Sequence, residues 1–385
     1  MEDELKKIGI MAFSDINPGG TFQYSQSMIY ALKNETKNKF IIFCDMIDNR
    51  FDNYGLEIRK FNLHKSSMII KFFKYFILIF KWNNSSFIIN HQEKKIFNDI
   101  DLFLSPFIVP YPAFFMNKPF IFTLHDMQER YYPEFFTLKG RITRRITNNA
   151  MAIKARKIIC ESEYVKSDII KFTGANKDKI VVIQSPPPQE FLSFNFDETN
   201  NKIIRKKYNL PQKYLFYPAQ SWFHKNHIRL LEAFNIIKNK IDDLHLILTG
   251  SKQNNYFNIM EQINKLNLND KVKHLGYIDY KDLPYIYKMS KMLVMPTLFE
   301  SVSIPIYEAF SLKVPVCCSN VTALPEQIGD AGLIFDPFDI KDMSDKIMMY
   351  LNNESLIIEK VQKGFERMLN FNHEEYKKKL LEIIE

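Results

Sequence analysis

The chain has 385 residues, which is long enough for two domains that each bury a core. Its hydrophobic residues (46%) and charged residues (25%) are present in the proportions typical of a soluble globular protein. The acidic start, Met1 to Lys7, leads directly into an apolar run and lacks the basic beginning of a signal peptide, so we expect no secretion signal here. The four cysteines have neither the spacing of a metal site nor a disulfide framework, so we expect a reduced, cytosolic compartment; they are Cys44, Cys160, Cys317 and Cys318.

The formal net charge of +8 is unevenly spread. Residues 1–190 contain 27 Lys and Arg against 20 Asp and Glu, a net charge of +7, whereas residues 191–385 contain 25 against 24, a net charge of +1. This asymmetry suggests that the first half meets an anionic partner, either nucleic acid or an anionic membrane surface.

Apolar runs and helical patterns alternate along the chain. In the first half we predict strands over residues 7–13, 40–44, 56–63, 101–105, 119–124, 158–160 and 179–184, and helices over 24–32, 67–82, 141–157 and 164–172. In the second half we predict strands over 214–219, 244–249, 272–275, 292–295 and 315–319, and helices over 228–238, 256–266, 280–289, from about 304, and 354–384. The alternation predicts an α/β fold of two doubly wound, Rossmann-like domains with parallel sheets.

A proline-rich break, Ser185 to Pro188, predicts the boundary between these domains. We therefore expect an N-terminal domain of residues 1–190 and a C-terminal domain of residues 191–365, facing each other across a cleft. A C-terminal helix over about 366–385 is expected to pack back on the first domain.

The segment Ser67 to Trp82 is rich in aromatic residues but interrupted by lysines, and it is too short to span a bilayer, which needs about 20 apolar residues. Lys71, Lys74 and Lys81 recur at spacings that place them on one helical face. We interpret this pattern as a helix that lies in the membrane interface. The alternative is an ordinary amphipathic helix packed on a sheet.

Two features of the first half are candidates for ligand contact. Gly19 and Gly20 lie in a turn between the first predicted strand and the first predicted helix. Such a turn can bind an anion; the alternative is that the glycines serve only the tight geometry of the turn. The dinucleotide fingerprint Gly-x-Gly-x-x-Gly is absent from this turn. His125 follows an apolar strand, and open α/β sheets bind ligands at that end of their strands, although a lone histidine is more often structural.

The second half contains a cation and two carboxylates with complementary chemistry. Lys225 lies between a strand and a helix, where it can hold a pyrophosphate. Glu300 and Glu308 stand eight residues apart across a loop that turns into a helix near Pro305. The backbone N–H groups of Val302 to Ile304 are expected to point outward at the positive end of that helix, where a phosphate can sit. Carboxylates accept hydrogen bonds from sugar hydroxyls, so the set fits a nucleotide-activated sugar; the alternative is a surface helix with acidic residues near its start.

Eight segments of the chain have the pattern of a known enzyme family. In the first half and at the start of the second they are Gly19-Gly20, Leu124 to Asp126, Tyr132 to Phe136 and Pro218 to His227. Later in the chain they are Phe299 to Pro315, Ser319 to Glu326, Gly329 to Gly332 and Asp336-Pro337. Together they resemble glycosyltransferase family 4, whose members are retaining enzymes of the GT-B fold. The resemblance covers nearly the whole chain. It implies the GT-B fold, a nucleotide-sugar co-substrate, no cofactor and no metal ion.

The resemblance also implies roles for the charged residues of the second half. It places Glu308 at the nucleotide ribose, Glu300 near the hydroxyls of the donor sugar, and Lys225 at the phosphates. Together with His125, which it places near the donor sugar and the acceptor, Lys225 and Glu300 are the candidate catalytic residues.

Other donor contacts follow from the same resemblance. Gly19 and Gly20 match the family's glycine loop, and the strand end at Tyr277 and Ile278 falls where the family binds the base. The chain departs from the family at two places. Gln220 stands five residues before the lysine, where an arginine is usual.

The second departure is Ser301-Val302-Ser303, which replaces the usual Gly-Phe-Gly between the two glutamates. Glycine lets a backbone approach a phosphate closely, and the loop lacks that freedom. Val302 and Ser303 remain candidate donor contacts, because the Ser303 hydroxyl can donate a hydrogen bond in compensation.

The resemblance implies transfer of a hexose with retention, in which the departing diphosphate accepts the proton of the acceptor hydroxyl and the protein supplies positioning and charge stabilisation. The segment His224 to His227 favours GDP-mannose as the donor. We expect a glycan or lipid-linked glycan acceptor in the synthesis of a bacterial surface polysaccharide, with the enzyme cytoplasmic, in peripheral contact with anionic membrane and without a nucleic-acid partner. The alternatives are a sugar-nucleotide 2-epimerase and a non-catalytic, transferase-like partner subunit.

Overall fold

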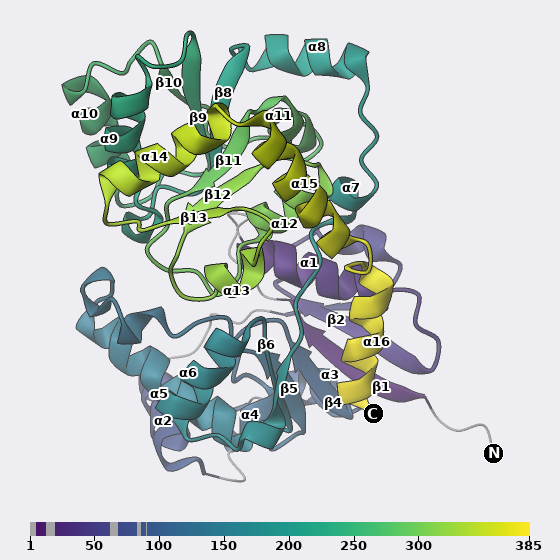
Figure 1. Ribbon diagram of the computed structural model, residues 1–385. Coiled ribbons are helices and arrows are strands. Elements are labelled where there is room, and N and C mark those ends of the chain that lie inside the picture. The colour runs from purple at the N-terminus through teal and green to yellow at the C-terminus, as the bar shows by residue number, and fades with distance from the viewer. Residues whose placement is uncertain (1–4, 13–19, 62–67, 83–85, 90) are drawn as a thin grey trace. The chain divides into compact units, whose positions relative to one another are not determined.

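The structure is a computed structural model that describes residues 5–12, 20–61, 68–82, 86–89 and 91–385 (Figure 1). The chain forms two compact units. The first unit is Met1–Ser185 with His373–Glu385, and the second unit is Pro186–Asn372. Each unit is built on one parallel sheet, as the alternation of apolar runs and helical patterns predicted.

The first unit has a seven-stranded sheet of order β3-β2-β1-β4-β5-β6-β7, in which all neighbouring strands are parallel. Its strands are β1 (Lys6–Met11), β2 (Asn38–Cys44), β3 (Glu57–Lys60), β4 (Leu102–Ser105), β5 (Phe120–Thr123), β6 (Lys157–Cys160) and β7 (Ile180–Val182). Its α-helices are α1 (Gly20–Leu32), α2 (Met68–Phe80), α3 (His91–Phe97), α4 (Ala113–Met116), α5 (Leu138–Lys154), α6 (Glu163–Thr173) and α16 (His373–Ile384). Short 3₁₀ turns include η2 (Ser86–Ile88), η3 (Gln128–Arg130) and η4 (Pro133–Phe135).

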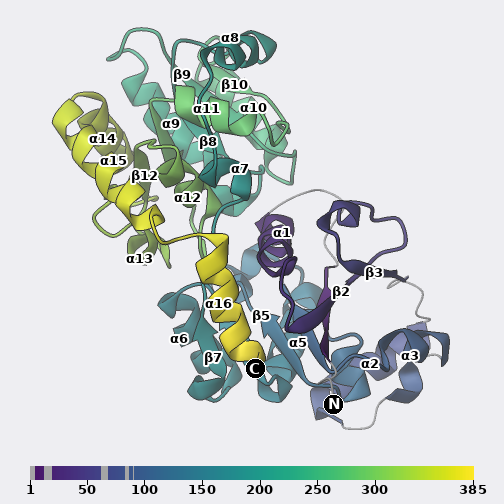
Figure 2. The same ribbon diagram turned by 90° about the vertical axis from the view of Figure 1, so that its right-hand side faces the viewer.

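The C-terminal helix α16 belongs to the first unit, where it packs against α1 (Figure 2). Its Leu380 and Ile384 are fully buried in the cluster that also contains Ile8 and Ile10 of β1. The single helix predicted over 354–384 is wrong, because the structure has two helices, α15 (Glu354–Met368) and α16, with a break over residues 369–372. Asparagines at 370 and 372 favour helix ends over helix interiors, which explains the break.

The second unit has a six-stranded parallel sheet of order β10-β9-β8-β11-β12-β13. Its strands are β8 (Lys213–Pro218), β9 (Leu244–Thr249), β10 (Val272–His274), β11 (Met292–Met295), β12 (Val316–Ser319) and β13 (Leu333–Phe335). Its helices are α7 (Gln189–Leu192), α8 (Glu198–Lys207), η6 (Phe223–Lys225), α9 (His227–Ile237), α10 (Tyr256–Lys265), α11 (Leu283–Met289), α12 (Ile304–Ser311), α13 (Leu324–Ile328), α14 (Ile340–Leu351) and α15.

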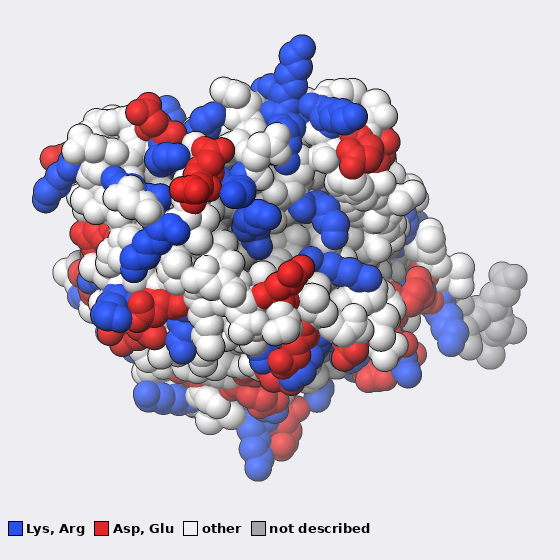
Figure 3. Space-filling model, turned by 45° about the horizontal axis from the view of Figure 1, so that its top comes forward, with Lys and Arg blue, Asp and Glu red and all other residues white. Residues whose placement is uncertain are grey.

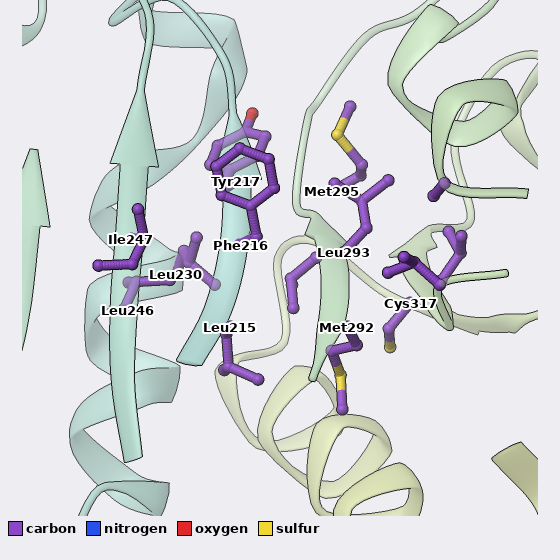
Figure 4. Packing of buried hydrophobic residues seen from close by; sticks show 14 of the residues in the cluster. Leu215, Phe216, Tyr217, Leu230, Leu246, Ile247, Met292, Leu293, Met295 and Cys317 are labelled. Atoms are coloured by element: carbon purple, nitrogen blue, oxygen red, sulfur yellow. The ribbon is translucent and has the colours of Figure 1, made fainter. Parts of the chain in front are cut away.

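The core of the second unit lies at the centre of its sheet (Figure 4). Side chains of β8, β9, β11 and β12 pack there with Leu230 of α9, and they include Leu215, Phe216, Tyr217, Leu246, Ile247, Met292, Leu293, Met295 and Cys317. Strand β8 pairs with β9 on one side and with β11 on the other, so the winding of the sheet reverses between β8 and β11. Ligands of open α/β sheets bind outside the carboxyl ends of the strands at such a switch point. This rule directs attention to the loops that follow β8 and β11.

Charge differs between the units, which contain 30 Lys and Arg against 23 Asp and Glu in the first and 22 against 21 in the second. The first unit therefore carries a net charge of +7 and the second a net charge of +1. On the face shown in Figure 3, basic and acidic side chains are interspersed.

None of the helices in the described ranges is long and apolar enough to cross a membrane. The four cysteines are buried free thiols.

Candidate active site

The loops that follow β8 and β11 are joined by hydrogen bonds at the switch point of the second unit. The backbone N–H of Leu298 donates to the carbonyl of His224 at 2.8 Å, and the Thr297 hydroxyl donates to the same carbonyl at 3.2 Å. The side-chain amide of Asn226, which has a left-handed backbone conformation (φ 57°), donates to the carbonyl of Pro296 at 2.9 Å. The two loops therefore form one fixed platform.

Lys225 and Glu300 face each other on this platform. The Lys225 ammonium donates a hydrogen bond to the Glu300 carboxylate, and the two side chains retain 18% and 14% of their exposure. The Tyr217 hydroxyl donates to the carbonyl of Lys225 at 2.8 Å, which fixes the backbone that carries the cation. Thr322 exchanges two hydrogen bonds with the backbone of Glu300, at 3.1 and 2.5 Å. The structure thus brings together two of the predicted catalytic residues, from loops 75 residues apart in the chain.

Glu308 lies one turn inside α12, with Pro305 in the first turn of the helix, as predicted. Its side chain is buried, and its Oε2 accepts a 2.6 Å hydrogen bond from the hydroxyl of Tyr287. Its Oε1 is buried and has no hydrogen-bond partner in the described part of the chain. Burial raises the pKa of Glu308 to about 7, although the Tyr287 hydrogen bond acts in the opposite direction. This carboxyl group has one unused acceptor position, which suits a hydroxyl group of a ligand.

The expectation of free backbone N–H groups from Val302 to Ile304 is wrong at Ser303. The backbone N–H of Ser303 donates to Oε1 of Gln327 at 2.8 Å, and Nε2 of Gln327 donates to the carbonyl of Ser303 at 2.7 Å. Both residues are buried. The Gln327 carboxamide therefore occupies the position at Ser303 that had been expected to meet a phosphate, while the Ser303 hydroxyl oxygen is buried without a partner in the described chain.

Gln220, Tyr277 and Ile278, the other predicted donor contacts of the second unit, lie beyond the carboxyl ends of β8 and β10, which β9 separates. Gln220 follows β8, and its side-chain Oε1 accepts a 2.8 Å hydrogen bond from the indole N–H of Trp222. Beyond β10, Tyr277 is 61% exposed, whereas Ile278 is buried in the core. Gly250 has φ +114°, and an added Cβ there would lie 2.6 Å from the carbonyl oxygen of Ala219, so only glycine lets these two loop backbones approach so closely.

His125 follows β5 in the first unit, where both ring nitrogens face acceptors. Its Nδ1 lies 2.9 Å from the Glu161 carboxylate, and its Nε2 lies 2.8 Å from the carbonyl oxygen of Pro106. Burial by itself lowers the pKa of His125, but the hydrogen bond and charge of Glu161 outweigh it, so the pKa lies above its ordinary value. A neutral imidazole can donate only one hydrogen bond, so two acceptors favour the imidazolium form. The catalytic role of His125 stays a prediction.

The predicted glycine pair is only partly described. Gly19 lies outside the described residues. Gly20 is the first residue of α1 and is exposed, and a Cβ at this position would meet no atom within 4 Å. A larger side chain would therefore fit at position 20 without a steric clash at Cβ.

Sequence reasoning missed the partners that orient the predicted residues. Glu161, which holds His125, could have been found, because it directly follows the buried strand β6, just as His125 follows β5. Tyr287 and Gln327 carry no such signal, since each lies inside a helix and acts across 21 or 24 residues of sequence. Among the residues described, no group of three or more His, Cys, Asp or Glu side chains is arranged to hold a metal ion.

Two family models match consecutive parts of the chain. The model described as glycosyltransferase family 4 matches residues 19–186, and the model described as glycosyl transferases group 1 matches residues 200–366. Together they cover 335 of the 385 residues.

The chain is similar in sequence to bacterial O-antigen chain mannosyltransferases. The chain is 30% identical over 236 residues to O-antigen chain mannosyltransferase B of Escherichia coli, a match that covers 60% of this chain and 61% of that protein. It is 27% identical over 228 residues to O-antigen chain mannosyltransferase RfbU of Salmonella typhimurium, covering 58% of this chain and 59% of that protein. The matched region thus spans about three fifths of the length of these relatives.

Solved structures share the fold over the whole chain. The crystal structure of Anabaena HepE in complex with UDP and glucose superimposes with a TM-score of 0.78 at 14% identity, covering 98% of this chain and 99% of that chain. The two parallel sheets and their helices are therefore those of the GT-B fold, as predicted.

Proposed function

The chain belongs to the group 1 glycosyltransferases of family 4, and from that premise we propose that it transfers a hexose from a nucleotide sugar to a glycan or lipid-linked glycan acceptor, with retention of configuration. The observation that carries this proposal is the pairing of Lys225 with Glu300 at the switch point of the second sheet. A cation that binds phosphate and a carboxylate that accepts sugar hydroxyls lie side by side there. The unused acceptor oxygen of the buried Glu308 adds a third group for the donor.

The proposed reaction needs no protein nucleophile. The bond between the anomeric carbon and the diphosphate oxygen breaks, and the acceptor hydroxyl oxygen forms its bond to that carbon on the same face. The departing diphosphate takes the proton of the acceptor hydroxyl. Lys225 stabilises the negative charge that develops on the diphosphate, and this kind of preorganised electrostatic stabilisation is usually the largest contribution of an enzyme to the rate. Neither a cofactor nor a metal ion takes part in the step as we propose it.

We propose GDP-mannose as the donor and a bacterial surface polysaccharide as the product. Two relatives named O-antigen chain mannosyltransferases support a mannosyl donor and a glycan acceptor. The segment His224-Lys225-Asn226-His227 at the platform points the same way.

Purified protein should show its donor by ligand-dependent stabilisation. We expect GDP and GDP-mannose to raise Tm by several degrees, and UDP, ADP and their sugars to raise it less. A ligand at 100 times its Kd stabilises the folded state by about 2.7 kcal/mol. Transfer is then measured with GDP-mannose and a mannose-terminated acceptor.

Other outcomes of this experiment would contradict the proposal in distinct ways. Stabilisation by a uridine or adenosine nucleotide alone would replace the donor and keep the transferase. Conversion of the donor sugar without any acceptor would identify a sugar-nucleotide 2-epimerase. If no nucleotide stabilised the protein, a non-catalytic partner subunit would fit best.

We also propose that the first unit contacts an anionic membrane on the cytoplasmic side. Four aromatic side chains at the end of α2 and just after it form a cluster in which neighbouring ring centroids are 4.5 to 6.5 Å apart; they are Phe76, Phe80, Trp82 and Phe87. These side chains are 39%, 66%, 52% and 61% exposed, although large aromatic rings usually contribute to a core. Tryptophan and phenylalanine next to basic residues are typical of helices in the membrane interface.

Charge and position support a lipid partner for this aromatic cluster. The unit carries a net charge of +7, and Lys154 Nζ donates to the carbonyl of Trp82 at 3.2 Å. On α5, which packs against α2, Leu138 and Ile142 are 64% and 49% exposed, and Arg145 lies on the same stripe of the helix. Exposed apolar and cationic side chains thus occur together on neighbouring helices.

Trp82 supplies a direct test, because the chain has two tryptophans and Trp222→Phe leaves Trp82 as the only one. We expect its emission to shift to the blue with vesicles of phosphatidylcholine and phosphatidylglycerol, and not with phosphatidylcholine alone. Replacing Phe80 and Phe87 by serine should lower the fraction that sediments with anionic vesicles about 10-fold or more. Equal response to both vesicle types would contradict an anionic partner.

A further inference from the structure

Trp222 has a defined place on the platform that carries Lys225. It lies in the loop between β8 and η6, and its carbonyl accepts a 3.1 Å hydrogen bond from the backbone N–H of Lys225. Its own backbone N–H donates to the carbonyl of Gln220 at 2.8 Å, and its indole N–H donates to the Gln220 side chain at 2.8 Å. Both hydrogen-bond donors of this residue are thereby bound to one neighbour.

The hydrogen bond to Gln220 leaves Trp222 only its ring face for contact with a ligand. Indole has a single polar atom, its N–H, and Gln220 accepts from it. Trp222 is partly exposed, so the part of its ring that remains available is apolar. An oriented aromatic surface with no free polar group is suited to stacking and not to hydrogen bonding.

Gln220 also stands where the resemblance places an arginine for the phosphates. Its carboxamide carries no charge, and Oε1 is engaged with Trp222. Gln220 therefore holds the neighbouring ring through Oε1, and the positive charge that this loop offers a phosphate is that of Lys225. The proposed transfer does not by itself assign a role to this oriented ring.

We propose that Trp222 is a sugar-contacting residue whose indole stacks on the apolar face of a pyranose ring, and that Gln220 is the positioning residue that orients it. The inference rests on the proposed hexosyl transfer. Trp222 is joined through its backbone to Lys225, whose side chain meets Glu300, so a sugar attached to a diphosphate at Lys225 lies within reach of this loop. The pyranose can belong to the donor or to the end of the acceptor, because both carry the same kind of ring.

Fluorescence of a single-tryptophan protein tests the contact without relying on activity. The variant Trp82→Phe leaves Trp222 as the only tryptophan. It is titrated with GDP, with GDP-mannose and with methyl α-mannoside, and donor binding is followed in parallel by Tm. A change in emission with GDP-mannose beyond that with GDP assigns the ring to the donor, and a change with methyl α-mannoside assigns it to the acceptor.

Two results would separate failure of this inference from failure of the proposed function. If GDP-mannose raises Tm but no sugar changes the emission of Trp222, the stacking contact is wrong and the transferase stands. If no nucleotide raises Tm, and methyl α-mannoside leaves the emission unchanged, both fail.

Kinetics of variants test the positioning role of Gln220. Trp222→Ala should raise the KM of the substrate that supplies the pyranose about 10-fold, which corresponds to about 1.4 kcal/mol, with kcat changed less. Gln220→Met removes the acceptor for the indole N–H and should raise the same KM. In a Trp222→Phe background, which has no indole N–H, Gln220→Met should add little. Full additivity of the two substitutions would overturn the assignment. Phe223→Ala, at the exposed residue that follows Trp222 in the chain, is the control.

Discussion

Lys225→Ala is expected to lower the rate of hexose transfer at least about 100-fold while leaving the protein folded. The loss is of the size seen when one preorganised group that stabilises charge in the transition state is removed. The Tyr217 hydroxyl of β8 binds the backbone carbonyl of Lys225, and the Glu300 carboxylate from the loop after β11 pairs with its ammonium group. The measurement is kcat and KM for the donor under saturating acceptor, with Tm recorded for each variant.

Two further variants test whether the effect of Lys225→Ala comes from the loss of this particular lysine. Lys271 lies in the same unit and pairs with Asp243 on the surface, so Lys271→Ala should leave kcat unchanged. Glu300→Gln removes the charge of the partner, and if Lys225 and Glu300 act on one donor their effects should be less than additive in the double variant. Near-normal turnover of folded Lys225→Ala protein would refute the assignment of this lysine to the diphosphate.

The backbone of the platform follows from local sequence, which is why it could be predicted. Continuous apolar runs such as Leu246–Leu248 and Met292–Met295 are buried on both faces of a parallel sheet, and the structure has strands over both ranges. Proline at 305 sets the start of α12, since its missing N–H needs no partner in the first turn. Because the ends of such runs meet at one edge of the sheet, Lys225 and Glu300 were expected near each other, and they are paired.

The pairing of side chains across that platform could not be predicted in the same way. A pattern of period two or 3.6 shows which face of an element is buried, but it does not show which buried polar group meets which. The Gln327 carboxamide binds the backbone of Ser303 from a helix that starts 21 residues later, and nothing in the local pattern of either segment indicates it. The same holds for Gln220, where the family pattern suggested a weakened phosphate contact and the structure shows a hydrogen bond to Trp222.

Glu308 should make the stability of the free protein fall as pH rises above about 4.5. In the unfolded chain this carboxyl group loses its proton near its ordinary pKa of 4.5, whereas in the folded chain burial raises the pKa to about 7. Between these values the unfolded state releases the proton and the folded state keeps it. Stability therefore falls by about 1.4 kcal/mol per pH unit over that interval, and by about 3 kcal/mol in all at pH 8.

The variant Glu308→Gln cannot ionise and should lose this dependence. Relative to the parent protein it should be more stable at pH 8 and similar near pH 4.5, as measured by urea unfolding at a series of pH values. His125 also titrates from a raised pKa, but its contribution is common to both proteins and cancels in the difference. Tyr287→Phe is the matched variant, because it keeps the ring that packs on Phe216 and removes the hydrogen bond that lowers the pKa of Glu308. It should move the pH-dependent difference to higher pH, and a shift to lower pH would contradict this account of the site.

Donor binding should show the opposite trend with pH. Ionised Glu308 offers acceptors to the ribose hydroxyls, so binding draws on the ionised form, which rises from about one tenth at pH 6 to about nine tenths at pH 8. The Kd of GDP-mannose, whose esterified diphosphate has no proton to lose in this range, should therefore fall several-fold, towards 10-fold, between these pH values. Glu308→Gln should bind the donor more weakly at pH 8 and show a flat profile. A flat profile in the parent protein would mean that Glu308 does not meet the nucleotide as a carboxylate, even if the stability measurements confirm its raised pKa.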